Sequence, residues 1–589
     1  MAKRWRIHPF DSDRIAALER SAGVPSVVAQ LLICRGINDV QSARDFLEVK
    51  LSGLREPGLL PGATEAAQRL SDAIDQKRRI VVYGDYDADG MTATAILLRT
   101  LQMLGADVGY HVPNRLNEGY GLSAEALQKL ARQGASLVIT VDCGIASVAE
   151  AAVARELGLE LIITDHHEMT DQLPEAQTLV HPRLPGTSYP FGGLCGAGVA
   201  LKVAWALCQL RSSGQKVDAR MRDLLMQSVG LAAIGTVADV VPLLDENRIL
   251  VQHGLTSLKA RPTLGLKKLM EITELDKKPS LSSEDIGFTL APRLNAAGRL
   301  GQAQLAVELL TTGSEERATA LAEYIHELNS SRDSLDRSVY LAANKQIKQR
   351  FDPEADAALV LAGHGWHAGV IGIVAGRLAE RYHRPVVVIS LDDLGVKPGT
   401  GSARSVEGLA LHEALASCGE HLIGHGGHAA AAGLKIEESK VDAFREDFCE
   451  YVASELSNQQ QTAELRIDAE TPLSALTMQT LGQIERLAPF GQGNPRPVLC
   501  TTDVQLAEPP KPMGSGGRHV SLRLTQHGVS LRAVAFGKGE WVDELQGVEG
   551  PLQIAYRPVI NEFRGRRSVE LHLVDWQVAE TADVKSAGF

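Results

Sequence analysis

Three short runs of β-branched and aliphatic residues most constrain the fold of this 589-residue chain. The runs are Ile80–Tyr83, Leu137–Val141 and Leu161–Thr164, and helical stretches separate them. Apolar strands that alternate with helices are typical of βαβ units, in which both faces of a parallel sheet are buried. The sequence therefore predicts an α/β fold built on a mostly parallel sheet.

The rest of the chain predicts further domains. The stretch 313–350 has no Gly or Pro after Gly313, which predicts a long helix, and a second α/β pattern starts at Ala357. Alternating segments at 520–524, 531–536 and 568–573 predict a small β-barrel of the OB type. We predict an N-terminal segment (1–50), a catalytic α/β domain (51–250), a helical connector (251–350), a second α/β domain (351–458) and a C-terminal OB-like β-barrel (459–589).

Bulk composition excludes several classes of protein. The seven cysteines are scattered without a C-x-x-C pair, which argues against a zinc ribbon and a disulfide framework. No apolar run reaches the ~18 residues of a membrane span, and the N-terminus lacks the apolar core of a secretory signal. A net charge of −12 disfavours a protein that coats nucleic acid, but it is compatible with local basic strips. We expect a cytoplasmic protein without membrane association.

Acidic and imidazole side chains follow each of the three predicted strands. Asp85, Asp87 and Asp89 follow the first, Asp142 the second, and Asp165-His166-His167 the third. Ligands collect at the carboxyl ends of the strands of an open parallel sheet. Carboxylates with a few imidazoles suit Mn²⁺ or Mg²⁺, and two such ions about 3.5–4 Å apart activate water for phosphoryl transfer. The sequence therefore predicts a two-metal site at this sheet edge.

Asp239 closes a run of small and apolar residues, Ile234–Ala238, and is predicted to stand at a fourth strand end. A buried lone carboxylate costs several kcal/mol unless a metal or another partner offsets it. A helix N-cap is an equal alternative for Asp239.

Structural alternatives exist for the other acidic residues as well. The stretch Asp85–Gly90 resembles the start of an EF-hand loop, but Ile96 stands where that loop needs Glu, and a strand precedes it. Simple turn chemistry for Asp85–Asp89, or an N-cap role for Asp165, explains each piece alone. Only the metal site explains all of them together.

Gly84–Gly90, Val141–Gly144, Asp165–His167 and Ala238-Asp239 resemble the four ordered motifs of the DHH phosphoesterases. Five further segments resemble the branch of this family that degrades single-stranded DNA from its 5′ end: 292–299, 366–372, 401–405, 426–428 and 489–495. The resemblance implies a parallel-sheet DHH domain joined by a long helix to an α/β DHHA1 domain, and an OB domain, around a DNA groove.

The resemblance also implies functional residues. It places Mn²⁺ or Mg²⁺ at Asp87, Asp89, Asp142, His166 and Asp239, with Asp85 and His167 as adjacent catalytic residues. Many family members have His where this chain has Asp85, so the motifs alone do not divide the ligands between the two ions.

Candidate substrate-binding residues lie farther along the chain. Gly426 and Gly427 offer backbone N–H groups, as a helix N-terminus does, although a packed turn is an alternative. By resemblance, His428 contacts the phosphate near the metals. Arg299, Ser402 and Arg404 are candidates for binding a terminal 5′-phosphate, and Arg115 is a candidate for binding the DNA backbone. A solvated surface charge is the alternative for each arginine. A basic cluster in the barrel is equally explained as a solvated face: Arg557, Arg564, Arg566, Arg567, Lys511 and Arg518.

These features together predict a metal-dependent 5′→3′ exonuclease that hydrolyses single-stranded DNA to 5′-mononucleotides in DNA repair and recombination. A helicase and a single-strand DNA-binding protein are the expected partners. One alternative is a DHH phosphodiesterase for short oligonucleotides, cyclic dinucleotides or pyrophosphate, which does not need the barrel. The other is a non-catalytic DNA-binding scaffold, which predicts eroded metal motifs.

Overall fold

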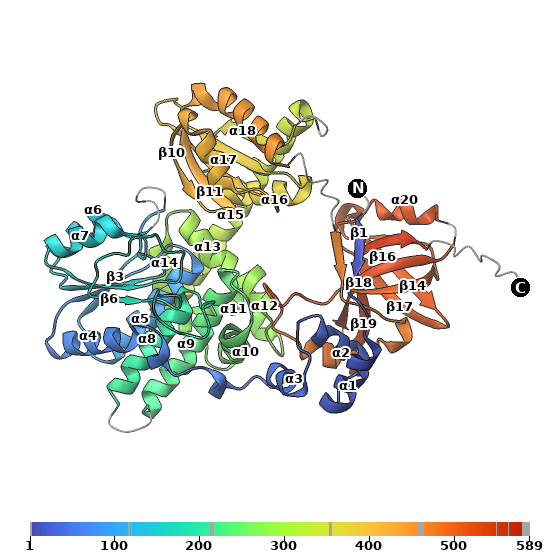
Figure 1. Cartoon of the computed structure of the whole chain (residues 1–589), viewed down its shortest axis with the longest axis horizontal. Coiled ribbons are helices and arrows are strands. Elements are labelled where there is room, and N and C mark those ends of the chain that lie inside the picture. Colours follow the sequence, from blue (N-terminus) through green and yellow to red (C-terminus); the bar gives the residue numbers. More distant parts are fainter. Residues whose placement is uncertain are drawn as a thin grey trace, which may run out of the picture. The chain divides into compact units, whose positions relative to one another are not determined.

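The computed structural model describes residues 3–115, 118, 121–212, 217–352, 356–456, 464–548, 550–563 and 565–579. The chain divides into two compact units, which are described separately (Figure 1). The larger, catalytic unit comprises Leu54–Val241 and Asp245–Gln460. The other, the barrel unit, comprises Met1–Gly53, Pro242–Leu244 and Gln461–Phe589. Among the described residues, no helix is both long and apolar enough to cross a bilayer.

The first domain of the catalytic unit is built on a five-stranded sheet in the order β3-β2-β4-β5-β6, and every pairing in it is parallel. Its strands are β2 (Ile80–Tyr83), β3 (Val108–His111), β4 (Leu137–Val141), β5 (Glu160–Thr164) and β6 (Thr178–Val180). The parallel sheet predicted from the apolar runs is confirmed. Because β3 lies on one side of β2 and β4 on the other, the strand order reverses at β2, and ligands bind at such a switch point.

Helices cover both faces of this sheet. Val81, Val138 and Leu161 share a core with Leu127 and Ala151 of helices α6 and α7 on one face. Helices α4, α5 and α8 lie on the other face (Figure 1). The five helices are α4 (Ala63–Asp75), α5 (Ala88–Met103), α6 (Ala124–Arg132), α7 (Val148–Glu156) and α8 (Gly196–Leu210). Every residue of β2 and β4 is buried, which explains their continuous apolar character.

A helical region follows the sheet. Its helices are α9 (Ala219–Ala238), α10 (Asp245–Ala260), α11 (Leu264–Ile272), α12 (Ser283–Asp285), α13 (Ala291–Arg299), α14 (Ala303–Thr311) and α15 (Glu315–Arg350). The long helix predicted over this stretch is present as α15, whose 36 residues begin after the N-cap Ser314. Helix α10 runs through residue 250, where the sequence suggested a domain boundary.

The second domain of the catalytic unit has a sheet in the order β10-β11-β9-β8-β7. Its strands are β7 (Leu359–His364), β8 (Val386–Leu391), β9 (Gly399–Arg404), β10 (Leu422–Gly427) and β11 (Ala431–Ile436). Its helices are α16 (Ile371–Tyr382), α17 (Leu411–Ser417) and α18 (Val441–Leu456). Val374 and Leu378 of α16 share a core with Val339 and Ala343, so α16 packs directly on the long helix α15.

The barrel unit contains the predicted OB barrel. Strands β14, β16, β17, β19 and β18 close into a ring, because β14 pairs with both β18 and β16. The unit's strands are β1 (Arg4–Ile7), β12 (Glu464–Ile467), β13 (Ala469–Glu470), β14 (Leu499–Leu506), β15 (Lys511–Met513), β16 (His519–Gln526), β17 (Val529–Ala535), β18 (Leu552–Phe563) and β19 (Arg566–Val578). Its helices are α1 (Ser12–Ala22), α2 (Ser26–Ile33), α3 (Val40–Leu47), α19 (Met478–Glu485) and α20 (Trp541–Gln546).

The N-terminal segment is part of this same unit. Strand β1 forms parallel pairs with β12 from Arg4↔Glu464 to Ile7↔Ile467. Leu31 and Leu32 of α2 are fully buried in one core with barrel residues such as Leu522 and Tyr556. The first and last parts of the chain therefore fold around a common core.

Candidate active site

Side chains at three strand ends meet at the switch point of the parallel sheet. Asp85 follows β2, Asp142 follows β4, and His166 follows β5; the two carboxylates are 3% and 2% exposed. Asp142 has a positive φ of 63°, a conformation that Asp tolerates better than most residues. Gly196 lies so close that a Cβ there would be 2.5 Å from the Cβ of Asp142. The local backbone is thus shaped to bring Asp142 into a crowded site.

The start of α5 holds two further carboxylates. Helix α5 begins at Ala88, which places Asp89 in its first turn. Asp87 is the N-cap, and its Oδ1 accepts hydrogen bonds from the backbone N–H groups of Asp89 (2.9 Å) and Gly90 (3.0 Å). The oxygens of Asp89 accept from the backbone N–H groups of Gly196 (2.7 Å) and Ala197 (2.8 Å) at the start of α8. Two helix N-termini therefore stabilise negative charge here.

Asp239 reaches the site from a helix and not from a strand, which corrects the sequence prediction. It is the C-cap of α9, so the alternative of an N-cap is also wrong. A helix C-terminus disfavours a carboxylate, and burial together with Asp89 and Asp87 raises the pKa of Asp239 to about 8. Gly235, one turn earlier, leaves room for Asp89, because a Cβ at Gly235 would overlap the Asp89 carboxylate. The cost of placing Asp239 here indicates a positively charged partner.

Asp165 orients the two histidines. Its Oδ1 is 2.7 Å from the Nδ1 of His167 and accepts from the backbone N–H of His166 (2.7 Å), while its Oδ2 accepts from the backbone N–H of Ile145 (2.9 Å). Burial acts to raise the pKa of Asp165, but the bond and charge of His167, the backbone N–H of Ile145 and the charge of His166 together lower it to about 2. Burial acts to lower the pKa of His167, but the bond to Asp165 and the charges of Asp165, Asp239 and Asp89 together raise it to about 9. Asp165 therefore fixes the tautomer and orientation of His167, a role that the sequence did not reveal.

Replacement of Asp165 by Asn is expected to lower the pKa of His167 from about 9 towards the ordinary ~6.5. In the wild-type protein, the Asp165–His167 pair stabilises the fold most between about pH 4 and about pH 6.5. The Asp165 contribution is lost as pH falls from about 4 towards about 2, and the His167 contribution is lost as pH rises from about 6.5 through about 9. Proton NMR titration of the metal-free protein measures the His167 pKa directly. An unchanged pKa in the variant would contradict this assignment.

All seven predicted catalytic residues converge. The Nε2 of His166 lies 3.1 Å from Asp142 Oδ1, 3.6 Å from Asp239 Oδ2 and 3.9 Å from Asp89 Oδ2. Potential ligand atoms lie within 4.8 Å of one another in three overlapping groups: Asp89, His166 and Asp239; Asp142, His166 and His167; and Asp85, Asp87 and Asp142. Asp142 and His166 each belong to two groups and link the set into one centre.

This centre fits divalent cations. Burial raises the pKa of Asp85 and of Asp142, and neighbouring carboxylates raise both further. Burial lowers the pKa of His166 to about 4, so its ring is a neutral, ligand-competent imidazole. The buried atoms Asp85 Oδ1, Asp142 Oδ1 and His166 Nε2 have no hydrogen-bond partner among the described residues. Metal ions would satisfy all three atoms and neutralise the carboxylates.

A second group of residues forms an open groove of about 810 Å³ beside the metal centre. Arg115, Ser402 and Arg404 line it. Burial lowers the pKa of Arg299 to about 10, and Arg115, Arg332 and Arg404 lower it further, whereas Asp87 acts in the opposite direction. Arg299 therefore lies close to Arg115, Arg332 and Arg404. It also lies near Asp87 of the metal centre. A cluster of like charges of this kind suits a phosphate group.

The start of α16 completes this groove. It falls in the segment 366–372, to which the sequence resemblance assigned no specific role. Gly369, Ile371 and Gly372 line the groove, and a helix N-terminus favours anions. A Cβ on Gly372 would lie 2.9 Å from Ser402 Oγ and 3.1 Å from an Arg404 nitrogen. Gly369 and Gly372, at the start of a helical sequence pattern, were the sequence signal from which this role could have been predicted. Tyr86 also lines the groove, with the Arg115 guanidinium 5.0 Å from its ring centre.

The Gly426-Gly427-His428 segment is not at a helix N-terminus, which corrects that interpretation. Gly426 and Gly427 end strand β10, and His428 begins the turn to β11. Gly427 has a φ of 136°, and a Cβ there would meet the backbone of Ala432 at 2.5 Å. Both glycines line the same groove as Arg404. Hydrogen bonding from Arg183 lowers the pKa of Glu168, and His428 adds to this effect, so His428 lies near the segment that carries His166 and His167.

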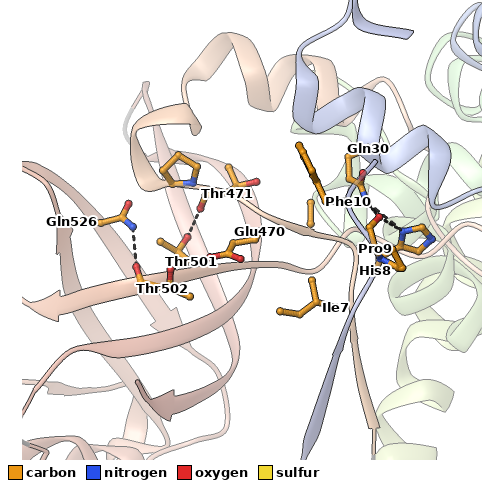
Figure 2. Close-up of a pocket in the computed structure, with 12 residues that line it drawn as sticks. Ile7, His8, Pro9, Phe10, Gln30, Glu470, Thr471, Thr501, Thr502 and Gln526 are labelled. Carbon is orange, nitrogen blue, oxygen red and sulfur yellow. Dashed lines mark hydrogen bonds between the residues drawn. The ribbon is translucent and has the colours of Figure 1, made fainter. Parts of the chain in front are cut away.

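The barrel unit has its own surface features. Arg566 and Arg567 lie in the β18–β19 hairpin and Lys511 on β15, in the two connections through which OB folds bind oligonucleotides, while Arg564 lies outside the described residues. A separate cavity of about 630 Å³ lies between the segment after β1 and the start of β14 (Figure 2). Its lining includes Phe10, which is 72% exposed, with Thr502 and Gln526. His8 is the sole basic side chain in that lining, so the cavity does not suit a phosphate.

Comparisons with known proteins assign all three folded parts. Family models match at residues 79–230 (DHH family, N-terminal domain), 355–454 (DHHA1 domain) and 467–575 (RecJ OB domain). The chain is 38% identical over 579 residues to the single-stranded-DNA-specific exonuclease RecJ of Bacillus subtilis, which covers 98% of this chain and 71% of that protein. It is 35% identical over 564 residues to the Escherichia coli protein of the same name, with coverage of 93% and 95%. A crystal structure of RecJ with Mn²⁺ from Thermus thermophilus matches with a TM-score of 0.82 and 32% identity, and it covers 98% of this chain and 80% of that chain.

Proposed function

Because the chain belongs to the RecJ family of DHH proteins, we propose that it is a Mn²⁺- or Mg²⁺-dependent exonuclease that releases 5′-mononucleotides from the 5′ end of single-stranded DNA. One observation supports this most strongly. A buried centre of five carboxylates and two imidazoles adjoins a groove lined by Arg115, Arg404 and a helix N-terminus, and Arg299 donates to the carbonyl of Gly369 in this lining. The first half is suited to hydrolysis of a phosphate ester, and the second is suited to capture of a terminal phosphate.

The metal centre supplies the chemistry. Bound at Asp87, Asp89, Asp142, His166 and Asp239, two divalent ions polarise the scissile phosphate and lower the pKa of a water molecule. Asp89 is held by the N–H groups of Gly196 and Ala197, so its oxygens keep one orientation throughout the reaction. Asp165 holds the His167 ring in the same way. Preorganised ligands of this kind reduce the reorganisation needed in the transition state.

The arginine groove sets the polarity in this proposal. Arg299 and Arg404 take the terminal 5′-phosphate together with Ser402 and the start of α16, and Arg115 contacts the backbone. Gly426 and Gly427 line the groove, and His428 lies near the segment that carries His166 and His167; in this proposal these three residues contact the phosphate near the metals. When the terminal phosphate is bound in this groove, the first phosphodiester bond lies at the metal centre. Cleavage of that bond releases one mononucleotide.

The two alternative functions receive less support. A non-catalytic scaffold predicts lost ligands, but all five proposed ligands are present and converge. A phosphodiesterase for short oligonucleotides, cyclic dinucleotides or pyrophosphate does not require the barrel, which matches the RecJ OB domain model.

We also propose a cytoplasmic role in DNA repair and recombination, alongside a helicase and a single-strand DNA-binding protein. An enzyme that acts on single strands needs another protein to open a duplex. The seven cysteines form no disulfide, as expected in a reducing compartment.

End-labelled single-stranded DNA tests the activity, with duplex DNA, pyrophosphate and a cyclic dinucleotide as controls. We expect Mn²⁺-dependent release of labelled mononucleotide from the 5′ end alone and complete loss of release after chelation of the metal. Thin-layer chromatography measures the product. Initial release of a 3′ label, or comparable hydrolysis of the cyclic dinucleotide, would refute the proposed function.

A further inference from the structure

The outer face of α15 and α16 carries a group of arginines stacked on aromatic rings. The guanidinium carbon of Arg377 lies 4.2 Å from the ring centre of Tyr340, and that of Arg381 lies 5.5 Å from the ring centre of Tyr382. Arg384 extends the row, 5.9 Å from the ring centre of Phe351. Arg377 and Arg381 are four residues apart, which places them on one face of α16, and Arg384 follows two residues after the helix ends at Tyr382.

Hydrogen bonds hold this row in place. Arg381 donates to the hydroxyl of Tyr340 (2.8 Å) and to Asn344 Oδ1 (3.4 Å), and the Tyr382 hydroxyl donates to the same oxygen (3.1 Å). Ordered guanidinium groups bind an anion at a lower entropy cost than mobile lysines do. The row is thus preorganised for a ligand with regularly spaced acceptors.

The charge of this face is strongly positive, although the whole chain carries −12. Arg337, Lys348 and Arg381 form no ion pair among the residues that the structure describes, and the first two are exposed. At about 100° per residue, Arg337 and Lys348 lie within about 80° of Tyr340 around the helix. Burial acts to raise the pKa of Tyr340, but hydrogen bonding to Arg381 and Asn344 and the charges of Arg381 and Arg377 together lower it.

The acidic groups near this face do not cancel its charge. Asp336 is 7% exposed and is paired with Arg377 at 2.8 Å, so its charge is turned inward. Two exposed carboxylates also lie near this face: Glu380 on α16, and Asp333 one turn before Arg337 on α15, which pairs with Arg332 at 2.9 Å. Arg337, Tyr340, Lys348, Arg377 and Arg381 are called the α15–α16 basic strip below.

The strip and the groove that takes the terminal phosphate share helix α16. Gly372 in the first turn of α16 lines the groove, and the Arg299 guanidinium donates to the Gly369 carbonyl just before this helix (3.2 Å). Arg377 and Arg381 of the strip lie farther along the same helix, beyond the groove. A strand whose 5′ end is fixed in the groove does not extend past its own terminus, so nucleic acid on the strip belongs to a different strand.

We propose that the α15–α16 basic strip binds the phosphate backbone of a second DNA strand, one that is not being cut. This inference rests on the proposed function, because it uses the position of the cut strand's 5′ end. Guanidinium groups contact phosphate oxygens through paired N–H donors. The uncut strand of an opened duplex is such a ligand.

Binding of a second strand tests the proposal while the groove is occupied. The full-length protein with Mn²⁺ is first saturated with a 5′-phosphorylated tetranucleotide that carries phosphorothioate linkages. A fluorescent 20-nucleotide strand with a blocked 5′ end is then titrated at several salt concentrations. We expect R337E/K348E to bind this strand about tenfold more weakly than wild type, with a salt slope lower by about 1.4. R381Q removes one positive charge, that of the arginine bonded to Tyr340 and Asn344, and should lower the salt slope of second-strand binding by about 0.7.

Matched controls keep the outcomes distinct. R220E/R222E makes the same charge change at two exposed positions of α9, and it should bind the second strand as wild type does. Hydrolysis of an ordinary 5′-phosphorylated tetranucleotide should be unchanged in all variants. Equal binding of the second strand by R337E/K348E and wild type would overturn the proposal, as would equally tight binding of polyglutamate, which would indicate an acidic protein partner. Absence of hydrolysis in wild type would instead refute the proposed function.

Discussion

Replacement of Asp142 by Asn is expected to reduce hydrolysis of single-stranded DNA by about 10³-fold or more, while the fold is kept. Asn has nearly the same shape as Asp and also tolerates the positive φ of 63° at this position. The change removes the charge of a side chain that belongs to two of the three groups of potential metal ligands. Loss of this one carboxylate therefore disturbs the sites of both ions.

The same substitution should raise the melting temperature of the metal-free protein above neutral pH. Burial and the neighbouring Asp89 raise the pKa of Asp142, so its ionised form destabilises the fold. A carboxyl group with a raised pKa contributes stability at low pH, and this contribution is lost as pH rises above the unfolded value of ~3.9. Calorimetry with and without Mn²⁺ measures both effects: the variant should gain stability without metal and gain less than wild type when metal is added.

Asp503→Asn is the matched control. Asp503 also has a positive φ, 54°, but it is exposed on strand β14 of the barrel unit. It should leave activity and metal-dependent stabilisation unchanged. Near-normal turnover of Asp142→Asn would remove Asp142 from the catalytic centre.

Replacement of Arg404 by Met is expected to reduce kcat/KM for 5′-phosphorylated single strands by roughly 10- to 200-fold, the range for a lost hydrogen bond to a charged group. Arg404 is held by its bonds to Ser402 Oγ (3.2 Å) and the Ala403 carbonyl (2.7 Å). Burial lowers the pKa of Arg404, and Arg115 lowers it further, so removal of this charge relieves repulsion between like charges. The fold should therefore tolerate the change.

The strand with a 5′-hydroxyl serves as the internal control for this prediction. If Arg404 grips the terminal phosphate, the variant should cut the 5′-hydroxyl strand as well as wild type does, and the preference for a phosphate should disappear. Steady-state kinetics on the two strands gives this ratio directly. An equal loss on both strands would show that Arg404 acts elsewhere along the backbone.

The catalytic sheet and its metal edge were predictable because their signals are local. Each apolar run, such as Ile80–Tyr83, is buried on both faces, and the acidic residues follow at once in sequence. Asp239 was misplaced because the run Ile234–Ala238 lies in a helix whose last turns are almost wholly buried, so it shows no helical periodicity.

Other features depend on contacts between distant residues. Ala429–Ala432 suggests a helix because Ala favours helices, but β11 pairs with β9 across the sheet, and this tertiary contact prevails. The arginine groove joins Arg115, Arg299 and Arg404, whose positions only the folded chain brings together. The pairing of β1 with β12 spans some 460 residues and leaves no local trace in the sequence.

The shared core of the two chain ends has a consequence for synthesis of the protein. The catalytic unit is complete once residue 460 has been made, whereas strand β1 and helix α2 must wait for strands that follow it. At about 5–20 residues per second, the ribosome needs roughly 20 to 90 s to make the residues that separate β1 from β12. During that time the apolar side chains of Leu31 and Leu32 lack their barrel partners. The catalytic unit in the middle of the chain can therefore fold first, and the first residues of the chain are among the last to reach their final positions.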